Sequence, residues 1–244
     1  MYDEVIMSNW QRIWNKKTPI EEKLYSDSIE EIFMELKRLT GNDTIKNGGV
    51  TYQSFIKQYT RLKEMLSRKH DIKSFFEVGC GSGPYLLLME NEGYEIGGMD
   101  YADTLIAVAE KVLKKPKELY CDEAKNLGTQ VEYDAVFSTS AFEYFESEEY
   151  AEEVLDRMLK KARHSIAILD VHDAALCEKY VEYRRSVIEN YDERYKGLSK
   201  MFFNKDFFEV YAKGHGLDLH IESSKLDGYW NQQFVFDVYL YKRG

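Results

Sequence analysis

The alternation of apolar and polar residues predicts an α/β domain that begins near residue 74. Short apolar runs predict strands near 74–79, 94–99, 117–121, 133–138 and 164–171. Apolar residues at helical spacing predict helices near 84–92, 102–115 and 147–163. Strands that alternate with helices form parallel βαβ units, so we expect a mostly parallel sheet with helices on both faces. Ligands of such sheets bind at the carboxyl ends of the strands.

The last part of the chain predicts two more strands. Apolar and polar residues alternate over 217–221 and again over 234–240, and an irregular loop over 223–232 separates the two runs. Such alternation is typical of strands with one buried face. We therefore expect a seven-stranded sheet whose last strand is antiparallel.

The residues before the first strand predict a helical extension. Trp10 and Trp14 stand four residues apart and therefore share one face of a helix. Residues 51–68 carry a single apolar stripe, which predicts an amphipathic helix packed on the domain. We divide the chain into an extension over 1–70 and an α/β domain over 71–244. The extension either packs on the domain or forms a lid over its site, and the sequence leaves both interpretations open.

A second helical addition is expected after the fifth strand, at about 172–201. This segment is too long for a tight connection and is rich in helix-forming residues. Insertions at the carboxyl edge of a sheet often cover the substrate, so we expect a substrate cap here. Arg184 and Arg185 would suit a phosphate or carboxylate group, although arginines on helices are usually solvated. The candidate substrate-binding residues are Trp14, Tyr180, Arg184 and Arg185.

The composition narrows the function. A formal net charge of −10 disfavours binding to the phosphate backbone of nucleic acids as the main activity. Cys80, Cys121 and Cys177 are scattered and form no C-x-x-C pair, so neither a disulfide framework nor a metal site is expected. No apolar run approaches the roughly 18 residues of a membrane span, and the N-terminus lacks the pattern of a secretion signal. We expect a cytoplasmic protein, monomeric or homodimeric, that binds a small molecule.

The segment from Phe75 to Pro84 carries the most informative chemistry. Its apolar run includes Glu77 and then places glycine at positions 79, 81 and 83. Such a turn lets a ligand touch the backbone because glycine has no Cβ, and the N–H groups at the start of the next helix favour a negative group. The dinucleotide fingerprint would need glycine at Pro84 instead. Asp100 ends the next apolar run, where a carboxylate can bind ribose hydroxyls.

Four segments resemble, in order, the motifs of the class I S-adenosylmethionine-dependent methyltransferases that act on small molecules. Glu77–Gly83 resembles the first motif, and Gly98–Asp100 is similar to the second. Cys121–Ala124 resembles the acidic segment beside the adenine, and Tyr133–Tyr144 resembles the motif of the fourth strand. The resemblance implies a Rossmann-like seven-stranded fold. It also implies S-adenosylmethionine as the cofactor and S-adenosylhomocysteine as the product.

The resemblance further implies where the cofactor binds. The glycine turn would hold the amino-acid end, and Glu77 would accept a hydrogen bond from the ammonium or else only fix the turn. Asp100 would accept both ribose hydroxyls or else cap the next helix. Asp122 would meet the adenine amino group or else remain a solvated charge. The cofactor-binding candidates are Glu77, Gly79, Cys80, Gly81, Gly83, Asp100, Tyr101, Asp122, Glu123, Ala124, Ser138 and Thr139.

The candidate catalytic residues are His172, Asp173 and Tyr144. Methyl transfer is an in-line displacement in which positioning and the exclusion of water supply most of the catalysis. An O–H acceptor would also benefit from a base, and His172, just past the fifth strand, is either that base or an ordinary loop residue. Asp173 would orient His172 or contact the substrate. Tyr144 stands where many members of the family carry histidine, which leaves the acceptor chemistry open.

Together these observations predict a methyltransferase that modifies a small polar acceptor at oxygen. One candidate is a sugar, or a phosphorylated or nucleotide-linked precursor, of a bacterial surface polysaccharide, because Trp10–Lys17 vaguely resembles the first residues of such enzymes. The alternatives are an N-methyltransferase of a small amine and a cofactor-binding regulatory protein without catalysis. A nicotinamide-dependent redox enzyme is a further alternative, which the glycine spacing disfavours.

Overall fold

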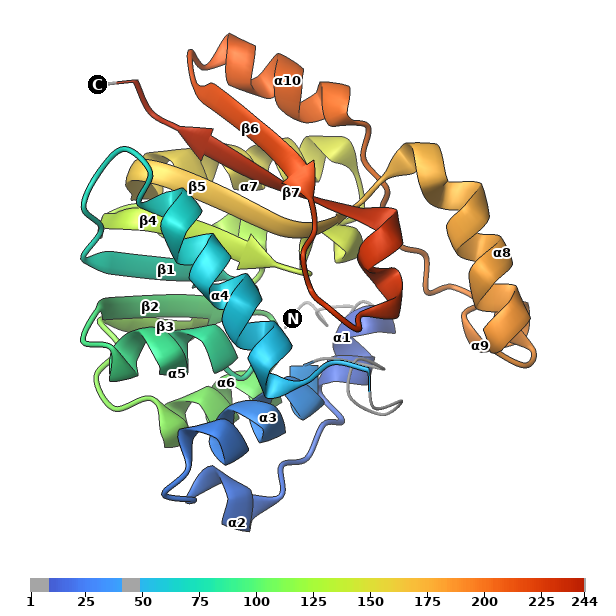
Figure 1. Ribbon diagram of the computed structural model, residues 1–244, viewed down its shortest axis with the longest axis horizontal. Helices are drawn as coiled ribbons and strands as arrows, with labels where there is room; N and C mark the ends of the chain where they lie inside the picture. Colours follow the sequence, from blue (N-terminus) through green and yellow to red (C-terminus); the bar gives the residue numbers. More distant parts are fainter. Residues whose placement is uncertain (1–8, 41–48, 244) are drawn as a thin grey trace, which may run out of the picture.

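The computed structural model describes residues 9–40 and 49–243. A seven-stranded sheet in the order β3-β2-β1-β4-β5-β7-β6 forms its centre (Figure 1). The strands are β1 (Ser74–Val78), β2 (Glu95–Asp100), β3 (Glu118–Cys121), β4 (Tyr133–Thr139), β5 (Ala162–His172), β6 (Asp218–Ser223) and β7 (Val235–Tyr241). β7 runs antiparallel to β5 and β6, and the other neighbouring pairs are parallel. The predicted fold class, with its antiparallel last strand, is confirmed.

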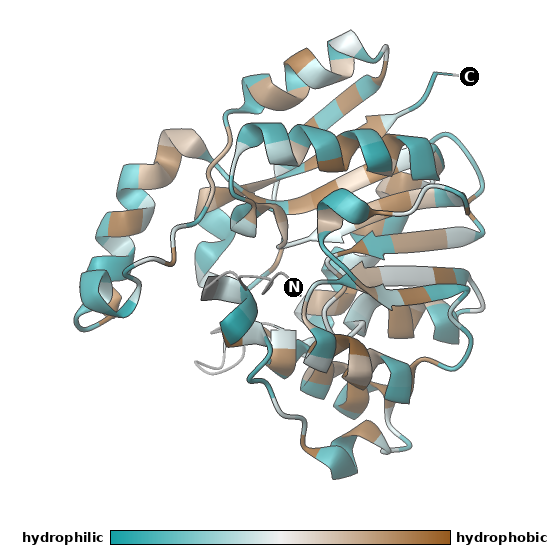
Figure 2. Ribbon diagram, turned by 180° about the vertical axis from the view of Figure 1, so that it is seen from behind, coloured by the Kyte–Doolittle hydropathy of each residue, from teal (hydrophilic) through white to brown (hydrophobic). Residues whose placement is uncertain are grey.

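Helices cover both faces of the sheet. α4 (Tyr52–Leu66), α5 (Pro84–Asn91) and α6 (Asp103–Val112) share a core with one face, and α7 (Glu148–Lys161) and α10 (Lys205–Gly214) share a core with the other. Successive strand residues point to opposite faces, so Phe75 belongs to the first core and Phe76 to the second. Figure 2 shows apolar residues concentrated on the strands between these helical layers. Both layers hold the sheet rigid and leave its carboxyl edge available for a site.

α6 ends earlier than the sequence pattern predicts. The helix stops at Val112, because Leu113 adopts an extended backbone (φ −81°, ψ 129°). The Leu113 side chain then lies beside Gly83, where a Cβ would come within 3.2 Å of Leu113 Cδ1. The end of α6 therefore packs against the start of α5.

The described part of the N-terminal extension packs directly on the domain. It contains α1 (Asn9–Trp14), α2 (Glu21–Leu24) and α3 (Ile29–Thr40), and the predicted amphipathic helix is α4. Trp10, Trp14 and Phe33 are buried in the same core as the sheet. Parts of the predicted extension, at 1–8 and 41–48, lie outside the described residues. Packing of α1 and α3 brings their side chains to the carboxyl edge of the sheet.

The predicted cap follows β5 as three short elements. These are the 3₁₀ turn η3 (Ala174–Leu176), α8 (Cys177–Val187) and α9 (Tyr191–Arg194). Further 3₁₀ turns are η1 (Ala124–Asn126), η2 (Phe142–Tyr144) and η4 (Trp230–Phe234). α8 and α9 project from the side of the sheet where the parallel strands end (Figure 1). None of the described helices is long and apolar enough to cross a membrane.

Candidate active site

A cavity of about 340 Å³ lies at the carboxyl edge of the sheet. The ends of β1, β2 and β5 contribute Glu77, Asp100 and Asp170 to its wall. Trp14 of α1 and Arg184 of α8 line it from the covering elements. The extension and the insertion therefore both reach the place where the sequence predicted a ligand.

The glycine turn after β1 is fixed in a shape that side chains would obstruct. Gly79 and Gly81 have φ angles of 74° and 54°, a region that residues other than glycine rarely enter. A Cβ on Gly79 would lie 2.6 Å from the Ala141 Cβ, and one on Gly81 would lie 2.4 Å from Thr40 Cγ2. Both glycines line the cavity, and Ala141 and Thr40 occupy the space where a side chain at these positions would lie.

Asp100 ties this turn to the end of β2. Its Oδ2 accepts the Gly81 N–H at 2.8 Å, and its Oδ1 accepts the Ala102 N–H at 2.9 Å. Burial raises the pKa of Asp100 to about 6, although these backbone hydrogen bonds oppose the rise. Each carboxylate oxygen keeps a second lone pair for a ligand.

Glu77 and Lys37 both line the cavity, and each affects the pKa of the other. Burial raises the pKa of Glu77 to about 8, and Lys37 opposes this rise. Burial lowers the pKa of Lys37 to about 8, and Glu77 and Asp170 oppose that shift. Glu77 Oε2 has no hydrogen-bond partner among the described residues. A buried acceptor without a donor is costly, so this oxygen is suited to a ligand that carries a donor.

The other predicted cofactor residues divide into two groups. Those that line the cavity are Cys80, Tyr101, Asp122, Glu123, Ala124 and Thr139. Asp122 is held in place there, because its Oδ1 accepts the Glu123 N–H at 2.8 Å and Asn126 Nδ2 at 2.7 Å. Gly83 and Ser138 do not line the cavity. Gly83 instead precedes α5 as its N-cap residue, and Ser138 is fully buried in β4.

Aromatic side chains form much of the remaining wall. The ring of Tyr144 lies 4.9 Å from that of Trp10 and 5.7 Å from that of Trp14. Trp10 Nε1 donates to the Ser199 carbonyl at 2.9 Å, which joins α1 to the segment after α9. Burial raises the pKa of Tyr144 well above its ordinary value, so its hydroxyl stays protonated and is unsuited to act as a base.

The two predicted arginines lie in different surroundings. Arg184 lines the cavity and is buried, with its Nη2 donating to the Tyr195 hydroxyl at 2.7 Å and its guanidinium 4.7 Å from the Trp230 ring. Arg185 is exposed and pairs with Asp192 at 3.0 Å. Tyr180 is buried behind the wall and does not line the cavity. Only Arg184 is therefore placed to contact a ligand directly.

The predicted base, His172, lies behind the cavity wall. It is fully buried, its Nδ1 lies 2.5 Å from Glu143 Oε2, and its Nε2 lies 3.0 Å from Asn231 Nδ2. Both ring nitrogens are thus engaged within the protein. Asp173 does not line the cavity either, and its Oδ1 accepts the Ala175 N–H at 2.9 Å. The geometry gives neither residue direct contact with a ligand in this cavity.

Glu143 lines the cavity in front of His172. Its Oε1 accepts a hydrogen bond from Lys200 Nζ at 2.9 Å. Burial alone would raise the pKa of Glu143, but Lys200 and His172 lower it to about 2. Glu143 is therefore a fixed anion with little affinity for a proton at neutral pH.

Several residues of the wall were not singled out by the sequence. They are Lys37, Glu143, Asp170, Lys200 and Tyr229. Lys37 comes from α3, and Lys200 comes from the segment after α9, so only the packing of distant elements brings them to the site. Glu143 and Asp170 lie next to residues that the sequence did single out, and a prediction that examined every charge at a strand end would have included them.

Comparisons with known proteins agree with this geometry. Residues 76–166 match the family model described as a methyltransferase domain. No curated protein sequence matches the chain.

Solved structures share the fold at low sequence identity. One is magnesium protoporphyrin IX methyltransferase from Synechocystis with bound S-adenosylhomocysteine, at 10% identity and a TM-score of 0.61 over 88% of this chain and 100% of that one. Another is the plantazolicin methyltransferase BpumL with a substrate analogue and S-adenosylhomocysteine, at 18% identity and a TM-score of 0.60 over 98% and 100%. A protein from Pyrococcus horikoshii has 17% identity and a TM-score of 0.60 over 79% and 91%.

Proposed function

We propose that this chain, whose residues 76–166 match the methyltransferase-domain family model and whose sheet has seven strands, transfers a methyl group from S-adenosylmethionine to a small acceptor. The observation that supports this most is the turn at Gly79–Gly81. Gly79 and Gly81 line the cavity, and Asp100 holds the turn in place through the Gly81 N–H. Two methyltransferases of similar fold contain S-adenosylhomocysteine.

The side chains around the turn fit the parts of this cofactor. Asp100 can accept both ribose hydroxyls on its remaining lone pairs. Glu77 Oε2 would accept a hydrogen bond from the ammonium, and Lys37 would pair with the carboxylate. Asp122 borders the place expected for the adenine. When bound, the cofactor supplies a methyl group on a cationic sulfur.

The acceptor would bind on the aromatic side of the cavity. Trp10, Trp14 and Tyr144 offer flat apolar surfaces, and Arg184 offers a cation beside them. A sugar that carries a phosphate or a nucleotide fits this wall, because aromatic rings pack on the apolar face of a sugar and arginine binds phosphate through two N–H groups. We therefore keep the prediction that the acceptor is a small polar molecule and that it is methylated at oxygen. A small amine remains the alternative acceptor.

His172 is proposed as a positioning residue. Its contact with Glu143 fixes one carboxylate oxygen, and Lys200 fixes the other. The wall on the acceptor side is then held rigid, which favours alignment of the reacting groups. A direct catalytic role for Asp173, the cytoplasmic location and the oligomeric state stay predictions.

Calorimetric titration with S-adenosylhomocysteine tests the proposal. We expect wild-type protein to bind, and we expect Asp100→Ala to weaken binding about 100-fold, because it removes two hydrogen bonds worth about 1.5 kcal/mol each. Asp218→Ala, at the start of β6, is the matched control and is expected to bind normally. Failure of the wild-type protein to bind, or binding of NADH instead, would contradict the proposal.

A second measurement separates an enzyme from a regulatory protein that only binds the cofactor. S-adenosylmethionine with a labelled methyl group is incubated with the protein and a filtered metabolite extract. We expect label in a small product, which mass spectrometry then identifies. Cofactor binding with no transfer to any extract would support the regulatory alternative.

A further inference from the structure

We propose that Asp170, at the carboxyl end of β5, lies at the point of methyl transfer and accepts the proton of the acceptor. This inference rests on the proposed function and assigns a step of that reaction to a residue that the sequence did not single out. Asp170 is buried and lines the cavity. Five observations support the assignment. They are the distorted backbone of Asp170, the distorted backbone of its neighbour, the hydrogen bonds of its carboxylate, the unsuitability of the other candidate bases and the position of Asp170 along the sheet.

The backbone of β5 is distorted at Asp170. The pairing of β5 with β7 shifts between Ile168 and Val171, which marks a β-bulge. Asp170 has a φ of 61°, in the left-handed region that costs a residue with a side chain about 1 kcal/mol or more. In a regular strand Asp170 and His172 would point to the same face. The bulge separates them, so that Asp170 reaches the cavity and His172 does not.

Ser140 shares this distortion on the neighbouring strand. It follows β4 with a φ of 54°, and its N–H donates to the Leu169 carbonyl at 3.1 Å. Its Oγ donates to Asp170 Oδ2 at 2.6 Å. Two adjacent strand ends are therefore both held in a strained conformation and joined through one carboxylate. Strain of this kind collects at functional sites, where the surrounding fold compensates for it.

Neutral donors hold the Asp170 carboxylate. Ser224 Oγ donates to Oδ1 at 2.9 Å, and Ser140 Oγ donates to Oδ2. The Asp170 N–H donates to Asp237 Oδ1 at 3.0 Å, which fixes the backbone. Burial raises the pKa of Asp170, and the two serines and Lys37 only oppose this rise. Asp170 is therefore oriented without being strongly neutralised, and it is a better proton acceptor than an ordinary carboxylate.

The competing groups are less suited to accept a proton. Glu143 lies between Lys200 and His172, which lower its pKa to about 2. Both nitrogens of His172 are engaged by Glu143 and Asn231. Tyr144 stays protonated, as its raised pKa shows. Of the carboxyl and imidazole groups among these residues, Asp170 alone combines contact with the cavity and a raised pKa.

The order of the strands places Asp170 two strands away from Glu77 along the carboxyl edge. Glu77 on β1 is proposed to bind the amino-acid end of the cofactor, and β4 and β5 follow next in the sheet. Arg184, on the proposed acceptor side, lines the same cavity as Asp170. Asp170 therefore shares one cavity with the residues proposed to bind the cofactor and with those proposed to bind the acceptor.

The step balances without another reactant. The acceptor oxygen forms a bond to the methyl carbon while the bond from that carbon to sulfur breaks. The electron pair of the broken bond stays on sulfur, which becomes a neutral thioether. Asp170 receives the proton that the acceptor oxygen loses and later releases it to water.

Binding measurements test the placement without knowledge of the acceptor. Sinefungin carries an amine where S-adenosylmethionine carries the methyl sulfonium, and S-adenosylhomocysteine carries no charge there. We expect Asp170→Asn to lower the preference for sinefungin over S-adenosylhomocysteine about tenfold, with the affinity for S-adenosylhomocysteine within threefold of wild type. Asparagine tolerates left-handed backbone, so the variant is expected to fold. Glu77→Gln is the comparison variant and is expected to weaken both ligands equally.

Each outcome decides the inference. An unchanged preference in Asp170→Asn, or an equal loss of both ligands, would overturn the placement while the proposed function stands. A wild-type protein that binds neither ligand would overturn the proposed function itself. With labelled S-adenosylmethionine and the metabolite extract, Asp170→Asn is expected to slow methyl transfer about 100-fold. A rate within threefold of wild type would remove the role as proton acceptor.

Discussion

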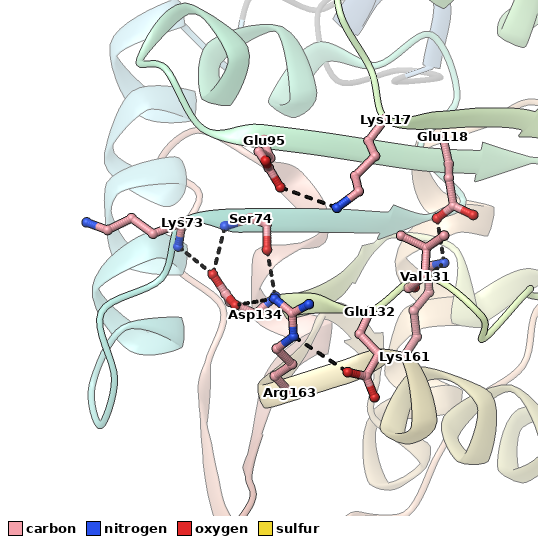
Figure 3. Close-up of polar contacts among 10 residues, drawn as sticks. All are labelled: Lys73, Ser74, Glu95, Lys117, Glu118, Val131, Glu132, Asp134, Lys161 and Arg163. Carbon is pink, nitrogen blue, oxygen red and sulfur yellow. Dashed lines mark hydrogen bonds and ion pairs between the residues drawn. The ribbon is translucent and has the colours of Figure 1, made fainter.

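The two edges of the sheet use the same kinds of charged residue in opposite ways. At the amino edge, Asp134 accepts hydrogen bonds from the N–H groups of Lys73 and Ser74 at 2.8 and 3.1 Å and from Arg163 at 3.1 Å (Figure 3). At the carboxyl edge, Asp100 accepts two backbone N–H groups and has no ion-pair partner among the described residues. The carboxylate at the amino edge has its hydrogen-bond and ion-pair partners within the protein. The carboxylate at the carboxyl edge can still accept hydrogen bonds from a ligand.

The pKa shifts of the two aspartates record this difference. Burial raises the pKa of both carboxyl groups. At Asp134 the Lys73 N–H, Arg163 and Ser74 overcome burial and lower the pKa. At Asp100 burial prevails, and the pKa rises to about 6. The carboxyl edge therefore carries charge at a cost in stability, as sites that bind charged or polar ligands often do.

Two lysines show the same contrast. Lys161 at the amino edge is fully buried, and its Nζ donates to Glu118 at 2.7 Å (Figure 3). It also donates to the carbonyls of Gly128 and Val131. Lys37 at the carboxyl edge lies 4.9 and 4.0 Å from the ring centres of Phe55 and Tyr85, and burial lowers its pKa to about 8. Lys161 is expected to support folding, whereas Lys37 is expected to support binding.

The largest effect is expected for Lys161→Met. The change leaves Glu118 and two carbonyls without their donor, which is expected to lower the free energy of unfolding by about 3 kcal/mol. Urea unfolding measures this loss. Calorimetry is expected to show affinity for S-adenosylhomocysteine within threefold of wild type, because Lys161 does not line the cavity.

Lys160 offers the matched control, since it is exposed and adjacent in the chain. Lys160→Met is expected to change the free energy of unfolding by less than about 0.5 kcal/mol. Equal losses in the two variants, or a large loss of affinity in Lys161→Met, would break the proposed division between the two edges.

The sequence predicts the part of the site that depends on local pattern. The glycine spacing at 79, 81 and 83 and the acid at position 100 follow directly from strand ends, so the fold and the turn could be predicted together. Their placement in one cavity follows from parallel strands that end at the same edge.

The rest of the site depends on contacts between distant elements. Lys37 comes near enough to Glu77 to lower its pKa only because α3 packs across the strand ends, and no spacing in the sequence indicates this. Asp170 and His172 differ by two positions, and a strand pattern cannot distinguish them without the bulge. Arg184 and Arg185 are adjacent, yet only the turn of α8 decides that Arg184 faces the cavity.

The pH dependence of the free energy of unfolding tests the difference between the two aspartates, first at Asp100. The unfolded chain loses this proton near pH 3.9, whereas the folded protein loses it at about pH 6. Stability is therefore lost as the pH rises through this window, because the unfolded state ionises first. Asp100→Asn removes the titration. The free energy of unfolding of wild type minus that of the variant is expected to fall by about 2 kcal/mol from pH 4 to pH 7. A flat difference would show that burial does not penalise this carboxylate.

Asp134 is expected to give a smaller difference of the opposite sign. Its folded pKa is lowered, so its contribution to stability is present above the unfolded pKa of about 3.9 and is lost as the pH falls through the folded value. The free energy of unfolding of wild type minus that of Asp134→Asn is expected to rise by about 1 kcal/mol from pH 3 to pH 5, a size typical of a partly exposed charged hydrogen bond. Denaturant unfolding at a series of pH values measures it with the Asp100 series. Two falling differences would mean that burial dominates at both edges, and two rising differences would mean that hydrogen bonds dominate at both. In either case the carboxyl edge would have no special cost for its ligand to offset.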